Sequence, residues 1–97
     1  MIVEIKEDKD RKIITIVDDE LIGNIFNEGE LVIDLSSKYF DGEKKSEAEI
    51  KKILEEKEVY LVNFIGKRSV VLGRTLGLLE DTNTIAGIEY GFFLKMR

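Results

Sequence analysis

Short runs of β-branched and apolar residues, separated by polar stretches, predict a chain built largely from strands. The first two runs flank a fully charged stretch, residues 7–10, and are typical of a hairpin with an exposed loop. The longest run, residues 59–65, is apolar at every position except Asn63, which predicts a buried strand. The strands expected from this pattern cover residues 2–6, 12–17, 31–35, 59–65, 84–86 and 89–96.

Three segments carry apolar residues at helical spacing. Asp18 precedes the first segment, and we expect its carboxylate to cap that short helix. Ser46 and Glu49 have the spacing of a capping box at the start of the second. The third begins after Gly66 and ends before Gly77. The residues that define these helices are Leu21, Ile22, Ile25 and Phe26, then Ile50, Ile53 and Leu54, then Val70, Val71, Leu72 and Leu76.

The order of these elements predicts the fold class. Residues 31–65 read as strand, helix and strand, an order typical of a right-handed crossover between parallel strands. Gly73 lies inside the third helix, where glycine costs about 1 kcal/mol relative to alanine, so we expect a close packing contact there. We predict a single α/β domain over residues 1–97, with α+β as the alternative. It would have an N-terminal hairpin and a mixed sheet of about five or six strands carrying about three helices.

The composition excludes several kinds of catalytic group and metal site. Charged residues make up 36% of the 97 residues, and the chain has no Cys and no His. This excludes disulfides, thiolate nucleophiles, imidazole bases and zinc sites of the usual kind. Abundant Glu, Lys and Ile are typical of heat-adapted proteins, which suggests a thermophile. Because the N-terminal residues lack the long apolar core of a signal peptide and no run approaches the length of a membrane span, we expect a cytoplasmic protein without membrane contact.

The start of the third helix is the first candidate site. Gly66, Lys67, Arg68 and Ser69 combine a glycine turn, free helix N–H groups and two cations, a combination that favours a phosphate. The segment lacks the glycine-rich loop of a P-loop. An ordinary solvated first turn of a helix is the alternative. The net charge of −5 argues against a broad attraction for nucleic acid, but a local basic patch remains compatible with it.

The C-terminal strand is the second candidate. Tyr90, Phe92 and Phe93 are followed by the cations Lys95 and Arg97, and aromatics with nearby cations can stack on the bases of single-stranded RNA. The alternative is a strand that packs on the core or pairs at a dimer edge. The candidate residues for anion or nucleic-acid binding are therefore Gly66, Lys67, Arg68, Ser69, Arg74, Tyr90, Lys95 and Arg97.

Two further polar clusters have simpler interpretations. The acidic cluster at residues 18–20 could hold a hard cation, but acidic residues also complement the dipole at a helix start. Residues 34–38 place Asp34, Ser36 and Lys38 at the end of a strand, and turn formation explains them without an activating base. We therefore predict no catalytic residue, metal ligand or cofactor.

Several short segments occur in a fixed order along nearly the whole chain. They cover residues 19–23, 26–34, 40–43, 63–70 and 76–79. With these segments at these spacings, the chain resembles the archaeal family catalogued as domain of unknown function four-two-four. The resemblance implies a compact α/β domain in an archaeal cytoplasm and supplies no established activity.

The chain departs from the family pattern near its C-terminus. Family members follow a Gly-Val pair with Pro-His-Ala-Gln, whereas here Gly87 and Ile88 are followed by Glu89, Tyr90 and Gly91. A function carried by that histidine or glutamine would be lost or altered in this protein.

The hypothesis that these observations favour is a non-catalytic binding module that contacts RNA or the translation apparatus. Its cations would be Lys67, Arg68, Arg74, Lys95 and Arg97. One alternative is a small phosphate- or nucleotide-binding enzyme. The other is a structural protein that binds a protein partner or forms a homodimer through the exposed edge of its final strand.

Overall fold

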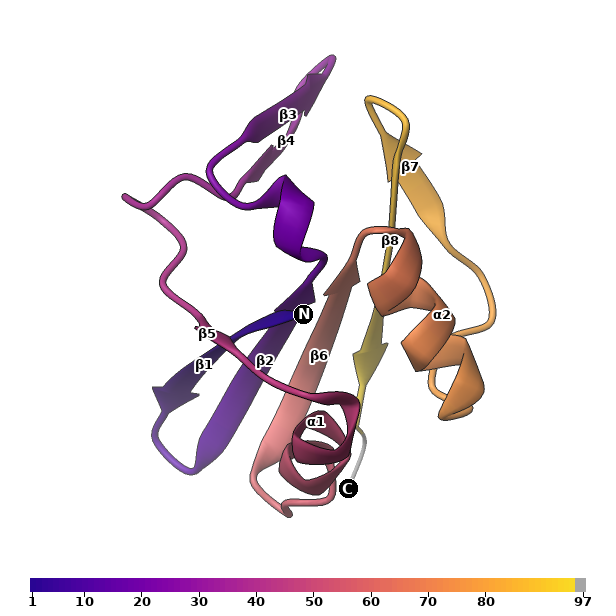
Figure 1. Ribbon diagram of the computed structural model, residues 1–97. Coiled ribbons are helices and arrows are strands. Elements are labelled where there is room, and N and C mark those ends of the chain that lie inside the picture. Colours follow the sequence, from indigo (N-terminus) through magenta and orange to yellow (C-terminus); the bar gives the residue numbers. More distant parts are fainter. Residues whose placement is uncertain (96–97) are drawn as a thin grey trace.

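The computed structural model describes residues 1–95, which form eight strands, two α-helices and one 3₁₀ turn (Figure 1). In chain order, these are β1 (Ile2–Asp8), β2 (Arg11–Val17), η1 (Asp19–Leu21), β3 (Ile25–Glu28), β4 (Leu31–Asp34), β5 (Glu43–Lys44), α1 (Glu47–Leu54), β6 (Val59–Ile65), α2 (Lys67–Thr75), β7 (Asn83–Ile85) and β8 (Ile88–Leu94). The predicted mixed α/β class and N-terminal hairpin are confirmed, with two α-helices in the described residues instead of three. Neither described helix is long and apolar enough to cross a membrane.

Six strands form one mixed sheet in the order β5-β1-β2-β6-β8-β7, which confirms the predicted strand number. Only β2 and β6 pair in parallel, and the connection between them carries a second sheet made of β3 and β4, then β5 and α1. The expected crossover from residues 31–35 to β6 was wrong, because β4 pairs with β3. The cause is Gly29, whose φ of 62° lets the two-residue turn of Gly29 and Glu30 reverse the chain into a hairpin.

The first predicted helix was also wrong. Only Asp19–Leu21 is helical, and Ile25 and Phe26 lie in β3. Gly23 interrupts the helix with a φ of 89°, and its N–H donates to the carbonyl of Leu35 at 2.8 Å. This bond continues the β3–β4 hairpin toward its base, so pairing with a later segment overrides the local helical spacing.

Both helices cover the same face of the six-stranded sheet, since α1 and α2 contribute buried residues to one core with β2 and β6. The parallel register places Ile14 beside Val62 and Ile16 beside Phe64, and these four side chains are buried under the helices. Helix α1 adds Ile50 to this core. The buried residues of the core are Val3, Ile14, Ile16, Ile50, Val59, Val62, Phe64, Val70, Leu72 and Leu79.

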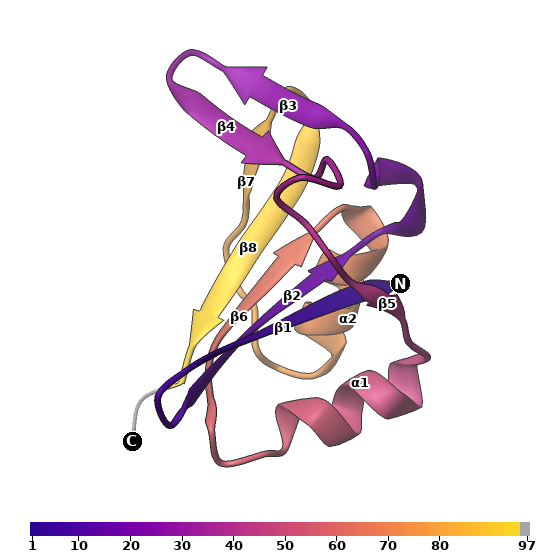
Figure 2. The ribbon, with the colours of Figure 1, turned by 90° about the vertical axis from the view of Figure 1, so that its left-hand side faces the viewer.

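The opposite face of the sheet is only partly covered. A second buried cluster of Val17, Leu35 and Phe40 lies at one end of this face and packs against Phe26 and Ile33 of the β3–β4 hairpin. This hairpin is seen at the top of Figure 2. Farther along β8, Phe92 and Leu94 are 63% and 40% exposed. The hairpin therefore shields one end of this face and leaves apolar side chains of β8 in contact with solvent.

Candidate functional site

The start of α2 is held by a carboxylate from a distant part of the chain. Asp18 follows β2, and its Oδ2 accepts the backbone N–H of Arg68 at 2.9 Å. Its Oδ1 accepts the N–H of Ser69 at 2.8 Å and the Ser69 hydroxyl at 2.7 Å. Asp18 is only 2% exposed, and it makes no side-chain cap hydrogen bond at η1. The expectation that Asp18 caps its own helix is therefore corrected, since its carboxylate caps α2.

The parallel pairing of β2 with β6 explains this contact. The two strands end side by side, with Val17 opposite Ile65, so the next residues, Asp18 and Gly66, are neighbours. Gly66 has a φ of 105°, and a Cβ at this position would lie 2.4 Å from Asp18 Cγ. Glycine is thus required both by the backbone conformation and by the approach of the carboxylate. The negative charge also complements the positive end of the α2 dipole.

This arrangement changes what the predicted anion site can do. Gly66, Lys67, Arg68 and Ser69 do lie together at the start of α2. However, the N–H groups of Arg68 and Ser69 donate to Asp18, and Ser69 is buried. An external phosphate at this site would therefore lack these two N–H groups and would rely more on the side chains of Lys67 and Arg68.

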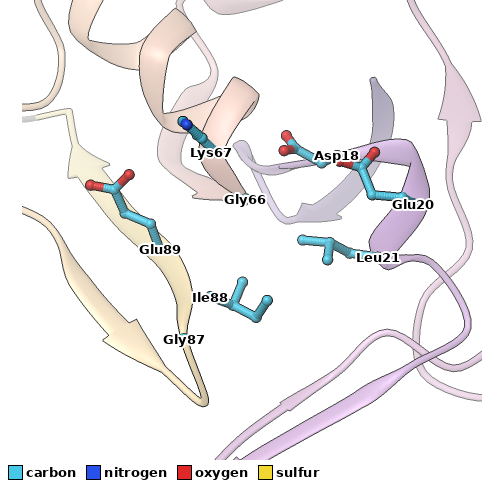
Figure 3. A pocket seen from close by; sticks show the side chains of 8 residues that line it. All are labelled: Asp18, Glu20, Leu21, Gly66, Lys67, Gly87, Ile88 and Glu89. Atoms are coloured by element: carbon cyan, nitrogen blue, oxygen red, sulfur yellow. The ribbon is translucent and has the colours of Figure 1, made fainter.

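A cavity of about 310 Å³ opens beside this cap, between η1, the start of α2 and the β7–β8 turn (Figure 3). Figure 3 shows Leu21 and Ile88 pointing into it from opposite sides. We call it the acidic pocket because Lys67 is the only cation among its lining residues, beside three carboxylates. It is lined by Asp18, Glu20, Leu21, Gly66, Lys67, Gly87, Ile88 and Glu89.

The carboxylates of the acidic pocket already have partners. Glu20 Oε2 accepts from Arg68 at 2.7 Å, and Glu89 Oε2 accepts from the Thr82 hydroxyl at 2.6 Å and from Arg74 at 3.1 Å. The hydrogen bond from Thr82, followed by the one from Arg74, lowers the pKa of Glu89 below its ordinary value.

A second cavity of about 540 Å³ lies between the start of α1 and one side of α2. We call it the basic groove because Lys44, Lys45, Lys67 and Arg68 line it, with Glu47 as the only acidic lining residue. Val71, which is 52% exposed, supplies an apolar surface inside it. The full lining consists of Met1, Lys44, Lys45, Ser46, Glu47, Lys67, Arg68, Val71, Leu72 and Thr75.

Lys44, Lys45 and Arg68 of the basic groove form ion pairs with carboxylates that do not line it. Lys44 Nζ lies 3.2 Å from Asp19 Oδ2, and Lys45 Nζ lies 3.4 Å from Glu43 Oε2. Arg68 pairs with Glu20 at 2.7 Å, with both side chains largely exposed. Exposed ion pairs of this kind contribute about 0–1 kcal/mol, so a bound anion can compete for these cations at little cost.

Sequence reasoning identified Lys67 and Arg68 but missed Lys44 and Lys45. A signal was present, because this lysine pair directly precedes the Ser46 capping box of α1. Local sequence did not indicate that the start of α1 lies beside α2.

The remaining predicted residues do not join the basic groove. Arg74 is paired with Glu89 and Thr82. Lys95 Nζ donates to the Glu56 carbonyl at 3.3 Å, at the other end of β6, where the Lys95 N–H also donates to the Tyr60 carbonyl. Tyr90 is half-buried on β8 and does not line the groove. Arg97 lies outside the described residues.

The two other polar clusters have structural roles in this fold. Asp34 Oδ1 accepts the N–H of Ser36 at 2.9 Å and its hydroxyl at 2.6 Å, a side-chain turn at the end of β4. Asp19 pairs with the Met1 amine and with Lys44, and these contacts, the Met1 amine first, lower its pKa. Within residues 1–95, no group of three or more acidic side chains could hold a metal ion.

Comparison with known proteins identifies relatives by sequence and by fold. The model of a family described as a protein of unknown function (DUF424) matches residues 5–96. A crystal structure described as an uncharacterized conserved protein from the archaeon Methanopyrus kandleri superposes with a TM-score of 0.76 at 18% sequence identity. The match covers 99% of this chain and 93% of that chain, and at this identity it shows the fold alone. The comparison with curated proteins found no match.

Proposed function

We propose, on the premise that this chain belongs to the DUF424 family of proteins of unknown function, that it is a non-catalytic module that binds RNA in its basic groove. The membership confirms the resemblance seen in the sequence. Because the family description names no activity, support for the proposal comes from the groove itself.

The observation that carries the proposal is the convergence of four cations on one groove in a protein of net charge −5. Lys44 and Lys45 come from the approach to α1, and Lys67 and Arg68 come from the start of α2. Cations spaced along an open groove suit a chain of several phosphates, because each can contact a different one. The exposed side chain of Val71 offers an apolar contact for a base or a ribose between them.

A polymeric anion fits this groove better than a single phosphate does. A tight site for one phosphate at α2 would use the N–H groups of the first helical turn, and Asp18 already accepts two of them. The hydroxyls of the groove also have helical roles, since Ser46 Oγ accepts the N–H of Glu49 and Thr75 Oγ1 donates to the Val71 carbonyl. These contacts favour binding over nucleophilic chemistry in the groove.

A fluorescence anisotropy titration with labelled, mixed-sequence single-stranded RNA tests the proposal. We expect binding at low salt that weakens as salt rises, because counterions are released from the phosphates. Lys67→Glu and Lys44→Glu should each weaken binding about tenfold or more and make it less sensitive to salt.

Lys52→Glu is the matched control, since it makes the same charge change on α1 at a residue that does not line the groove. It should weaken binding much less. The proposal fails if the protein does not bind RNA at low salt, or if Lys52→Glu is as damaging as Lys67→Glu.

A further inference from the structure

The six-stranded sheet is protected against pairing with another chain along β1 and β5 at one side and along β7 at the other. At one side, β5 covers only Ile2 and Val3 of β1, and the rest of β1, residues 4–8, carries four charged side chains. At the other side, β7 has three residues and presents Asn83 and Thr84. Charged side chains and short strands are the usual devices that keep sheet edges from associating.

The end of β8 lacks these devices. β7 pairs with β8 only as far as Tyr90, whereas β6 pairs with it as far as Leu94. Among the described strands, residues 91–94 of β8 therefore have a partner on one side only. Their sequence is Gly-Phe-Phe-Leu, without a charge or a proline. We call this segment the β8 edge.

Backbone hydrogen bonds show which groups the β8 edge offers. The carbonyl of Glu89 accepts from Gly66, and the N–H of Lys95 donates to Tyr60, each at 2.8 Å, so the odd-numbered residues face β6. Hydrogen-bonding direction alternates along a strand, so the N–H and C=O groups of Phe92 and Leu94 face outward. Their side chains share one face and are 63% and 40% exposed.

We propose that a second copy of this chain pairs with the β8 edge in antiparallel orientation, about a two-fold axis at Phe93. In this register, Phe92 faces the partner subunit's Leu94 and Leu94 faces the partner subunit's Phe92, and both residue pairs exchange backbone hydrogen bonds. The edge is complementary to itself, because each aromatic ring meets a leucine and no like charges oppose each other within residues 91–94. The result is one continuous sheet through both copies. This inference is independent of RNA binding.

Light scattering at increasing protein concentration tests the dimer. We expect the measured mass to rise from 11.1 kDa toward twice that value. Phe92→Lys should keep the mass at the monomer value, because it places a charge at the edge. Val32→Lys is the matched control, since Val32 is exposed on β4 and should leave dimerisation unchanged. A monomer at every concentration, or a dimer unaffected by Phe92→Lys, overturns the proposal.

A cysteine cross-link tests the register. In the proposed pairing, Phe93 faces the partner subunit's Phe93 as a non-hydrogen-bonded pair with a Cα separation of about 4.5 Å, close enough for a disulfide. The natural chain has no Cys, so only the introduced residue can react. Phe93→Cys should form a covalent dimer under mild oxidation, and Val32→Cys should not. Equal cross-linking of the two variants, or none by Phe93→Cys while the wild-type protein dimerises, contradicts this register.

Discussion

At the scale of single residues, Asp18 joins two parts of the chain that lie fifty residues apart in the sequence. Its buried carboxylate accepts three hydrogen bonds from two consecutive residues, Arg68 and Ser69. Removing this carboxylate would leave its donors without an acceptor. The free-energy cost of such unpaired donors exceeds what the hydrogen bonds contribute while they are intact. Within the acidic cluster at residues 18–20, Asp18 is therefore the residue that anchors the start of α2.

Asp18→Ala should lower the free energy of unfolding by about 3 kcal/mol, because three donors lose their acceptor and α2 loses its cap. Urea denaturation followed by circular dichroism measures this change. Glu20→Ala is the control, since it removes only the largely exposed ion pair with Arg68 and should cost less than about 1 kcal/mol. Similar losses for the two variants would contradict the capping role.

At the scale of elements, α2 depends on the absence of a side chain at Gly73. A Cβ at this position would lie 2.6 Å from Leu79 Cδ1 and 3.2 Å from Phe64 Cδ1. The close packing contact predicted from the sequence is thus present. It lets the segment after α2 fold back so that Leu79 reaches the core on the helix-covered face.

Gly73→Ala should destabilise the protein by about 1 kcal/mol or more, although alanine favours a helix, because overpacking outweighs the gain in propensity. Thermal or urea unfolding measures the effect. In a Leu79→Ala background the space is vacated, so the same change should be neutral or stabilising. An equal cost in both backgrounds would show that the contact with Leu79 is not the cause.

The elements also show which sequence signals could be interpreted correctly. The capping box of α1 formed as predicted, with Glu49 N–H donating to Ser46 Oγ at 3.1 Å, because all its atoms lie within one turn. Gly77, the glycine predicted to follow α2, also adopts the expected left-handed conformation, with a φ of 74°. The β3–β4 hairpin was not predicted. Its two strands pair with each other, whereas the apolar spacing of either strand alone is also compatible with a helix.

The candidate site, too, could be predicted only where its residues are adjacent in the sequence. Lys67 and Arg68 are adjacent in sequence and were found, but Lys44 and Lys45 reach the same groove from more than twenty residues away. The Asp18 cap spans fifty residues. No periodicity or spacing encodes such contacts, because they depend on how β2 and β6 are paired.

At the scale of the whole molecule, the absence of His means that no side chain has an ordinary pKa between about 5 and 8. The change in the free energy of unfolding at low pH therefore comes from the carboxylates. The pKa of Glu49 is lowered by the backbone N–H of Ser46, and that of Glu89 by Thr82 and then by Arg74. A lowered pKa in the folded state means that the carboxylate stabilises the fold above its ordinary pKa, and this stabilisation is lost as pH falls through the lowered value.

We expect the free energy of unfolding to change little between about pH 5 and 8 and to fall below about pH 4. A Glu49→Gln, Glu89→Gln double variant should be less stable at neutral pH and show a shallower acid decline. Glu80→Gln, which changes an exposed carboxyl, is the control. Urea denaturation across this pH range provides the measurement, and a decline as steep in the double variant as in the wild-type protein would refute the assignment.

The Asp18 cap also constrains the order in which the protein folds. Helix α2 is only nine residues long, and a helix this short is marginal in isolation. Its capping residue, Asp18, lies fifty positions before Arg68 in the chain and reaches α2 only after β2 has paired with β6. The contact order of this step is high, so loop-closure entropy must be overcome before α2 gains its stabilisation. A stable α2 therefore marks a late event in folding, after the centre of the sheet has formed.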